Sequence, residues 1–210
     1  MLLAAGVDLL GFPLRLPVNK EDLSEAVAAE IIRRLNDKNR AVLITYLDNA
    51  EEILNFCDLL GVTIVQLHGP VALPELRKIK RKRSNIKIIK SLVVREDNRL
   101  QLFQDIEKFG DTVDAFITDT FDPESGASGA TGKTHDRAIS RELAEHSPKP
   151  VILAGGLTPD NVYEAIMIVR PDGVDAHTGV EGAGGRKDAE KLRCFVAEAR
   201  RAIADLQNAG

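Results

Sequence analysis

The sequence has only two cysteines, no long apolar run and no excess of positive charge. Cys57 and Cys194 both lie in helical patterns, so we expect two reduced packing residues of a cytoplasmic protein. No apolar run approaches the roughly 20 residues that a membrane span needs. The N-terminus has no basic residues ahead of Asp8, which makes it a poor signal peptide. The net charge of −4 favours neither a nucleic acid nor a membrane as partner.

Two signature motifs are also missing. No Gly-x-Gly-x-x-Gly follows the first strand-like run, which weighs against a dinucleotide-binding fold. His68, His135 and His177 show no tight ligand spacing such as His-Glu-x-x-His, so we predict no metal site. The basic run at 78–83 ends a helical pattern without interleaved aromatic residues. We interpret it as a solvated helix end rather than a nucleic-acid surface.

What the sequence does contain is a regular alternation of apolar runs and amphipathic helical patterns over 210 residues. Such an alternation predicts an α/β fold with a parallel sheet, in a single domain that spans residues 1–210. Asp48 is expected to cap the helix at 50–60. The predicted strands are Val7–Phe12, Ala41–Tyr46, Thr63–His68, Ile86–Val94, Ala115–Thr120, Val151–Ala154 and Gly173–Thr178.

Seven strand–helix units are one fewer than a closed (β/α)8 TIM barrel needs. The segment from Leu2 to Gly6 looks like the end of a helix closed by a C′ glycine. We therefore interpret the chain as a TIM barrel that lacks its first strand and most of its first helix.

Two consecutive apolar runs end in small residues: PVILAGGL, which ends at Leu157, and GVDAHTGVE, which ends at Glu181. Glycines at the carboxyl end of a strand let backbone N–H groups approach an anion, and a helix N-terminus adds positive dipole. One such turn alone would be interpreted as a tight turn. Two in succession near the C-terminus favour the phosphate site of a barrel.

Other strand ends offer candidate side chains. Asp119 lies between apolar neighbours, and removal from water raises the pKa of a carboxyl group, so Asp119 could act as a general acid. The alternative is that Asp119 only caps or turns the loop that follows the strand. Gln66 and His68 alternate along one strand and point to one side, and we predict them as ligand-pocket residues. The glycine-rich segment 126–134 fits a substrate-covering loop better than a nucleotide P-loop.

Together these residues resemble the phosphoribosylanthranilate isomerase family of tryptophan biosynthesis. The resemblance implies a (β/α)8 barrel, an Amadori rearrangement without cofactor, and a small phosphorylated sugar as substrate. We expect a monomer or a homodimer. The matching segments, in the order of the family, are GVDLLGF (6–12), VQLHG (65–69), TDT (118–120), GATGKTHD (129–136), LAGGLTPDNV (153–162), GVDAHTGVE (173–181) and GRKD (185–188).

The resemblance also implies roles for particular residues. Asp119 is the acid that helps to open the ribose ring. The residues implied to bind the substrate phosphate are Gly155, Gly156, Thr178 and Gly179, with Asp175 nearby.

The chain departs from the family at four places, one of which is His135-Asp136-Arg137 where the family usually has Phe-Asp-Trp after the glycine-rich loop. The family begins with a strand carrying Lys-x-Cys-Gly, whose cysteine is the general base, and this chain starts after it. Cys57 and Cys194 are expected on helices and cannot replace that cysteine. Arg15 or Lys20 could substitute for the family's arginine, which holds the anthranilate carboxylate. The usual Ser-Ser before Gly-Val-Glu is here His177-Thr178.

Three functional hypotheses are compatible with this pattern. The first is an isomerase of the family. The second is a divergent barrel that acts on another sugar phosphate, motivated by Arg15 and His177. The third is a ligand-binding homologue that lost the base. An upstream reading frame encoding Lys-x-Cys-Gly would favour the first, and phosphate-dependent binding without turnover would favour the third.

Overall fold

The computed structural model describes residues 1–17, 23–95, 97–120 and 136–208. Parallel strands alternate with helices, and the order of the strands in the sheet follows the order of the chain. This confirms the predicted α/β fold with a parallel sheet. The strands are β1 (Leu10–Pro13), β2 (Ala41–Thr45), β3 (Ile64–Leu67), β4 (Lys87–Val94), β5 (Ala115–Thr120), β6 (Val151–Leu153) and β7 (Gly173–Val174).

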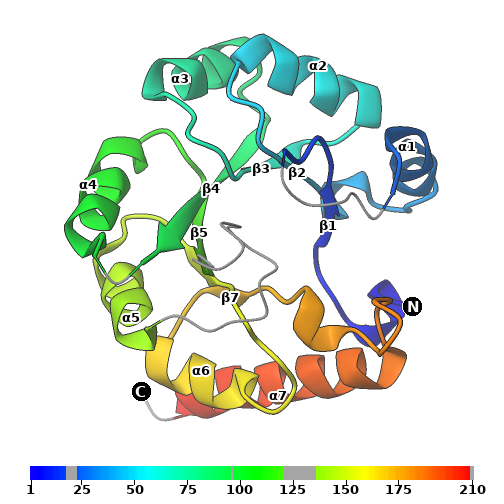
Figure 1. Ribbon diagram of the computed structural model, residues 1–210, viewed down its shortest axis with the longest axis vertical. Helices are drawn as coiled ribbons and strands as arrows, with labels where there is room; N and C mark the ends of the chain where they lie inside the picture. Colours follow the sequence, from blue (N-terminus) through cyan, green and yellow to red (C-terminus); the bar gives the residue numbers. More distant parts are fainter. Residues whose placement is uncertain (18–22, 96, 121–135, 209–210) are drawn as a thin grey trace. The chain divides into compact units, whose positions relative to one another are not determined.

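The described residues form seven α-helices, which alternate with the strands (Figure 1). They are α1 (Glu25–Arg33), α2 (Ala50–Leu60), α3 (Leu73–Lys82), α4 (Arg99–Phe109), α5 (Arg137–His146), α6 (Val162–Val169) and α7 (Ala189–Asn208). The part of the chain that the structure describes also contains the short 3-10 helices η1 (Leu3–Ala5), η2 (Lys38–Arg40) and η3 (Thr178–Val180).

The chain divides into two compact units, which are described separately below. Unit 1 comprises Met1–Val7, Leu92–Glu107 and Phe116–Gly210. Unit 2 comprises Asp8–Ser91 and Lys108–Ala115.

Unit 2 is built on β1, β2, β3 and the first part of β4. The strands β2 and β3 are short apolar runs, AVLIT and IVQL, and most of their side chains are buried. Strands that are covered on both faces read as continuous apolar runs rather than as alternating patterns. Helices α1, α2 and α3 lie outside these strands (Figure 1).

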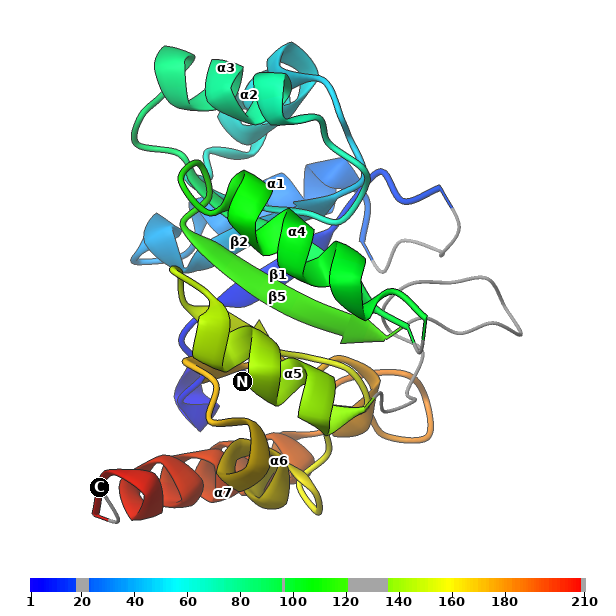
Figure 2. The same cartoon turned by 90° about the vertical axis from the view of Figure 1, so that its left-hand side faces the viewer.

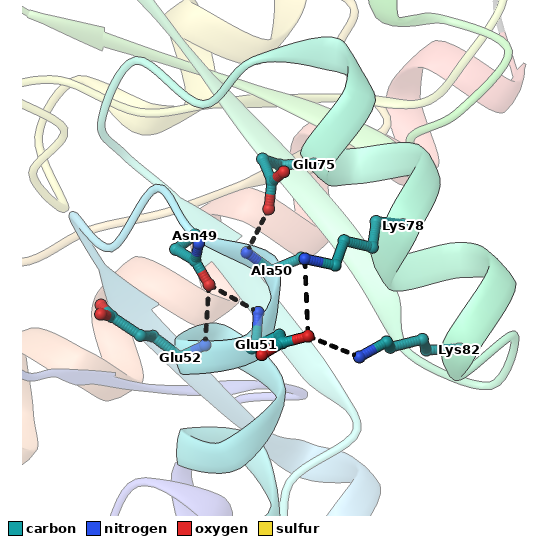
Figure 3. Close-up of polar contacts among 7 residues, drawn as sticks. All are labelled: Asn49, Ala50, Glu51, Glu52, Glu75, Lys78 and Lys82. Carbon is teal, nitrogen blue, oxygen red and sulfur yellow. Dashed lines mark hydrogen bonds and ion pairs between the residues drawn. The ribbon is translucent and has the colours of Figure 1, made fainter.

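The start of α2 corrects one prediction. Asn49, and not Asp48, is the N-cap, because its side-chain oxygen accepts hydrogen bonds from Glu51 N (2.9 Å) and Glu52 N (3.3 Å) (Figure 3). Asparagine is as good an N-cap as aspartate, so composition alone could not choose between adjacent residues. The helix ends where predicted, at a left-handed Gly61.

Helix α3 is tied to α2 through its acidic and basic side chains (Figure 3). Glu75 Oε2 accepts a hydrogen bond from Ala50 N at 2.7 Å, which satisfies one of the free donors at the start of α2. Lys78 and Lys82 of the basic run pair with Glu51 at 3.6 Å and 2.8 Å. Part of the basic charge is therefore neutralised at the surface of unit 2.

Unit 1 has a core between the sheet and its last two helices. Figure 2 shows α6 between α5 and α7. The buried apolar residues that form this core are Leu153, Leu157, Val162, Ala165, Ile166, Val169, Val180, Leu192, Phe195, Ala199 and Ala202. As predicted, the N-terminal helical turn ends at a left-handed Gly6. Arg200 of α7 donates a hydrogen bond to Gly6 O at 3.1 Å, which holds the N-terminal turn against α7.

Two predicted strands have an end that differs from the prediction by three residues or more, while the other ends differ by one residue at most. The first begins at Leu10 rather than at Val7, because Val7 N bonds back to Leu2 O and stays with the N-terminal turn. The last ends at Val174 rather than at Thr178, because the chain turns there into the 3-10 helix η3.

A polar network in unit 2 surrounds Asp114. Its carboxylate accepts hydrogen bonds from Ile88 N (2.8 Å), Lys87 Nζ (3.2 Å) and Lys80 Nζ. Partial burial alone would raise the pKa of Asp114, but the hydrogen bonds from Lys80, Ile88 and Lys87 outweigh it and lower that pKa below its ordinary value. The network favours the charged carboxylate in the folded state.

We expect Asp114→Asn to destabilise the protein at neutral pH by roughly 1–3 kcal/mol, because Lys80 loses its charged partner. A lowered pKa contributes stability above the unfolded-state pKa near 4, and this contribution is lost as the pH falls through the folded-state pKa. The difference between the two proteins should therefore shrink below about pH 4. Urea unfolding of both proteins at pH 7, 5 and 3 measures this difference in the free energy of unfolding.

Asp58→Asn is a suitable control for the Asp114 prediction. Asp58 pairs with Arg83 at 2.7 Å, but its side chain is 53% exposed. Exposed pairs contribute little, so this variant should stay within about 1 kcal/mol of the parent. A loss in Asp114→Asn that is the same at pH 3 and pH 7 would show that the charge of Asp114 is not responsible.

Candidate active site

Asp119 is buried near the end of β5, in unit 1. The residue is 7% exposed, and Oδ1 accepts a hydrogen bond from Thr120 N at 2.8 Å. The preceding residue, Thr118, accepts a hydrogen bond at Oγ1 from Ala154 N at 3.2 Å. Ala154 directly precedes the Gly155-Gly156 turn. The structure therefore brings the end of β5 next to the first of the two predicted phosphate turns.

Asp175 is the second acidic residue of this region. It follows β7 and is held by a hydrogen bond from its N to Leu153 O at 2.9 Å. The residue is exposed at the surface, but neighbouring protein atoms partly desolvate its carboxyl group. This desolvation raises the pKa of Asp175, and the negative charge of Asp119 raises it further, while His177 and Lys187 act in the opposite direction. The two carboxyl groups are therefore electrostatically coupled.

The first glycine turn has a backbone that only glycine adopts readily. Gly155 (φ 100°) and Gly156 (φ 61°) both have left-handed backbone conformations. Asn161 braces the turn, because its side chain donates to Gly156 O (3.0 Å) and accepts from Thr158 N (2.9 Å). Helix α6 then starts at Val162. The arrangement of glycine turn and helix start is the one predicted for anion binding.

The second turn packs directly on the first. Thr178, Gly179 and Val180 form η3, and a Cβ added to Gly179 would lie only 1.9 Å from Leu157 O and 3.1 Å from Thr158 Cγ2. Only glycine permits this approach. The two turns that the sequence analysis assigned to one phosphate site are therefore in direct contact.

Lys187 is a residue of this region whose role the sequence analysis did not assign. Its Nζ donates to His177 O at 2.9 Å and pairs with Glu181 Oε1 at 2.6 Å. The same carboxylate lies 3.3 Å from His177 Nδ1. Lys187 therefore contacts the residues on both sides of η3 and stabilises this turn. The GRKD segment was noted as a motif, but a contact across ten residues leaves no periodic signal in a sequence.

Unit 2 carries the other predicted ligands, Gln66 and His68. Gln66 is buried, and its Nε2 donates to Ser91 Oγ of β4 at 3.3 Å. His68 follows β3, and its ring centroid lies 4.7 Å from that of Tyr46, which follows β2. Gln66 therefore contacts the next strand, β4, while His68 contacts the residue that follows β2.

Arg15, a predicted substrate ligand, has local partners in unit 2. Its guanidinium donates to both carboxylate oxygens of Glu25 (2.8 and 3.1 Å) and lies 3.8 Å from the centre of the Phe56 ring. The hydrogen bond from Arg15 lowers the pKa of Glu25. A substrate carboxylate at Arg15 would have to compete with Glu25. Lys20, the other candidate, and His135 lie outside the described residues, as does the glycine-rich segment 126–134.

Cys57 does not have the properties of a general base. Cys57 lies on α2 and is 1% exposed, and burial together with the charge of Asp58 raises the pKa of its thiol to about 12. Cys194 is exposed on α7. Their expected placement on helices is confirmed, but only Cys57 is the packing residue that was expected, because Cys194 is exposed.

The described part of the chain contains no group of three or more His, Cys, Asp or Glu side chains that could hold a metal ion. Among the helices of the described residues, none is both long enough and apolar enough to cross a membrane.

Known proteins are similar to this chain in sequence and in fold. The family model for N-(5'-phosphoribosyl)anthranilate (PRA) isomerase matches residues 13–198. N-(5'-phosphoribosyl)anthranilate isomerase 2 of Methanosarcina mazei is 38% identical over 204 residues, which cover 97% of this chain and 89% of that protein. The crystal structure of phosphoribosyl anthranilate isomerase from Thermotoga maritima is similar with a TM-score of 0.78 and 29% identity, covering 95% and 91% of the two chains.

A second solved structure holds a bound molecule. It is a phosphoribosyl anthranilate isomerase in complex with reduced 1-(o-carboxyphenylamino)-1-deoxyribulose 5-phosphate. It matches with a TM-score of 0.76 and 26% identity, over 95% of this chain and 91% of that one. The family model covers most of the chain, and the Methanosarcina relative aligns along nearly its whole length. This chain therefore belongs to the N-(5'-phosphoribosyl)anthranilate isomerase family.

Proposed function

We propose that this chain converts N-(5'-phosphoribosyl)anthranilate into 1-(o-carboxyphenylamino)-1-deoxyribulose 5-phosphate in the cytoplasm, as a step of tryptophan biosynthesis. Family membership supports the reaction. One structural observation supports the location of the site: the hydrogen bond from Ala154 N to Thr118 Oγ1, which joins the strand end that bears Asp119 to the first glycine turn. In this proposal, Asp119 and the first glycine turn contact the same sugar phosphate.

Asp119 acts as the acid in this proposal. It gives a proton to the ring oxygen of the ribose while the bond from that oxygen to C1 breaks, and the nitrogen lone pair forms a C=N bond. A base then removes the proton from C2, which leaves an enolamine that tautomerises to the C2 ketone. C1 is reduced and C2 is oxidised within one molecule, so the reaction balances without an external oxidant or reductant.

The substrate phosphate binds at the two glycine turns. Gly155 and Gly156 present backbone N–H groups ahead of α6, and the start of that helix adds positive dipole. Thr178 and Gly179 approach from η3. Asp175, coupled in charge to Asp119, is suited to accept a hydrogen bond from a sugar hydroxyl. The roles of Gln66, His68, Arg15 and Lys20 as further substrate ligands stay predictions.

The loss of phosphoribosylanthranilate fluorescence tests this proposal. Two proteins are compared: the present chain, and the same chain extended by a strand of the family's Lys-x-Cys-Gly pattern. We expect decay of the fluorescence with at least one of them, above the rate of an Asp119→Asn control. If neither protein accelerates the decay, the glycine turns serve another phosphorylated ligand and the proposed reaction is wrong.

A further inference from the structure

A substrate that bears anthranilate presents an aromatic ring, and this chain has few aromatic side chains to receive it. The sequence contains seven Phe, two Tyr and no Trp. Five phenylalanines are buried in the cores: Phe12, Phe56, Phe109, Phe116 and Phe195. Of the aromatic residues that the structure describes, only three are partly exposed: Tyr46, Phe103 and Tyr163.

Two of these three lie on helices with partners of their own. Phe103 of α4 packs against His146 of α5, with 5.5 Å between ring centroids. Tyr163 of α6 donates its hydroxyl to Asp205 at 2.8 Å, and the guanidinium of Arg201 lies 3.8 Å from the centre of its ring. Tyr46 differs from both, because it follows the carboxyl end of β2. The carboxyl ends of strands are where barrel enzymes bind their substrates.

The face on which Tyr46 lies can be established from the strand register in unit 2. Ile44 of β2 is paired with Gln66 of β3, so their side chains share a face of the sheet. Tyr46 and His68 each follow two residues later and share that face as well. Their ring centroids are 4.7 Å apart at a tilt of 41°. A substrate ring that reaches this face meets two aromatic rings in adjoining positions.

The backbone beneath this pair is firmly held. His68 N donates to Thr45 O at 3.0 Å. Gly69 packs so closely that an added Cβ would lie 2.9 Å from Tyr46 O. Lys90, buried on β4, donates from Nζ to Gly69 O at 3.1 Å. A preorganised pair of rings lowers the ordering cost of binding.

We propose that the Tyr46 ring, packed against His68, binds the aromatic ring of the substrate and makes Tyr46 a specificity-determining residue for N-aryl over N-alkyl aminosugars. This inference rests on the proposed function. The physical basis is the offset or edge-to-face packing that aromatic rings prefer at centroid separations of about 4.5–7 Å. The separation of Tyr46 and His68 themselves lies in this range.

Binding measurements separate this role from a structural one. The probes are reduced 1-(o-carboxyphenylamino)-1-deoxyribulose 5-phosphate, which carries the aryl ring, and ribose 5-phosphate, which lacks it. Loss of one aromatic contact in Tyr46→Leu should weaken binding of the aryl probe roughly three- to tenfold and leave ribose 5-phosphate unchanged. Tyr46→Phe keeps the ring and should bind both probes as the parent does.

Phe103→Leu is the matched control, because it removes a partly exposed ring that also packs against a histidine, but on helices. The Phe103→Leu variant should bind the aryl probe and ribose 5-phosphate with the affinities of the parent. Equal loss of both probes in Tyr46→Leu would indicate damage to the fold and overturn the inference, and so would an unchanged affinity for the aryl probe. If the parent protein binds ribose 5-phosphate and the aryl probe with equal affinity, the inference about Tyr46 is wrong while the proposed function stands. If the parent binds neither probe, the proposed function fails and this inference with it.

Discussion

The Asp119→Asn variant should lose turnover of phosphoribosylanthranilate by about 10²–10⁴-fold, the usual contribution of a positioned general acid. Asparagine has nearly the same shape and keeps the oxygen that accepts from Thr120 N. It cannot give a proton to the ribose ring oxygen. The hydrogen bond of Thr118 with Ala154 N is independent of this change, so the glycine turns should stay intact. Initial rates measure the loss of turnover. Titration with ribose 5-phosphate shows whether the glycine turns still bind a phosphate.

Asp136→Asn is the control for this experiment. Asp136 is an exposed N-cap of α5 in the same unit, and asparagine caps helices equally well. Its turnover should match that of the parent. Turnover near the parent level in Asp119→Asn would remove Asp119 from the acid role, while a joint loss of turnover and ribose 5-phosphate affinity would indicate that Asp119 maintains the structure of the site.

The Gly179→Ala variant should bind the substrate phosphate poorly. Its new methyl group would lie 1.9 Å from Leu157 O and 2.8 Å from Leu157 C, both backbone atoms that cannot rotate away. One of the two turns must therefore move. Forcing extra volume into a packed site costs about 1–3 kcal/mol, so we expect lower stability and an increase in KM on the order of tenfold. Steady-state kinetics and thermal unfolding measure the two effects.

Gly184→Ala separates this effect from a general loss of glycine. Gly184 lies in the loop that follows η3, is exposed, and has no atom within 4 Å of an added Cβ. The variant should retain the KM and the stability of the parent. An unchanged KM in Gly179→Ala would mean that the phosphate does not bind at the junction of these turns.

Much of the fold was predictable because it depends on local sequence. Helices α2 and α3 have the predicted ends, since apolar spacing, Gly61 and the basic run are all local signals. The two glycine turns were predictable for the same reason. The ends of the first and last strands were predicted less well, because contacts outside the strands decide them. Val7 leaves the first strand to join the N-terminal turn, and the last strand ends early because η3 packs on Leu157.

The residues that brace the candidate sites were harder to predict. Lys187 bonds to His177 O, and Lys90 bonds to Gly69 O, across ten and 21 residues. Neither contact has a periodic signature. For Lys90 one signal was present: a lysine within the apolar run KIIKSLVV, where a buried charge requires fixed partners. Tyr46 was counted only as the last residue of a strand, because its proximity to His68 appears only once β2 and β3 are paired.

The contact between Gly179 and Leu157 has a thermodynamic consequence. The two turns support each other through backbone atoms, and Asn161 and Lys187 fix them from outside. The amide groups that a phosphate would meet are therefore already oriented before it arrives, and few rotatable bonds are left to freeze. Calorimetry of inorganic phosphate should then show a small entropic penalty from the protein, with most of the ordering cost carried by the remainder of the substrate.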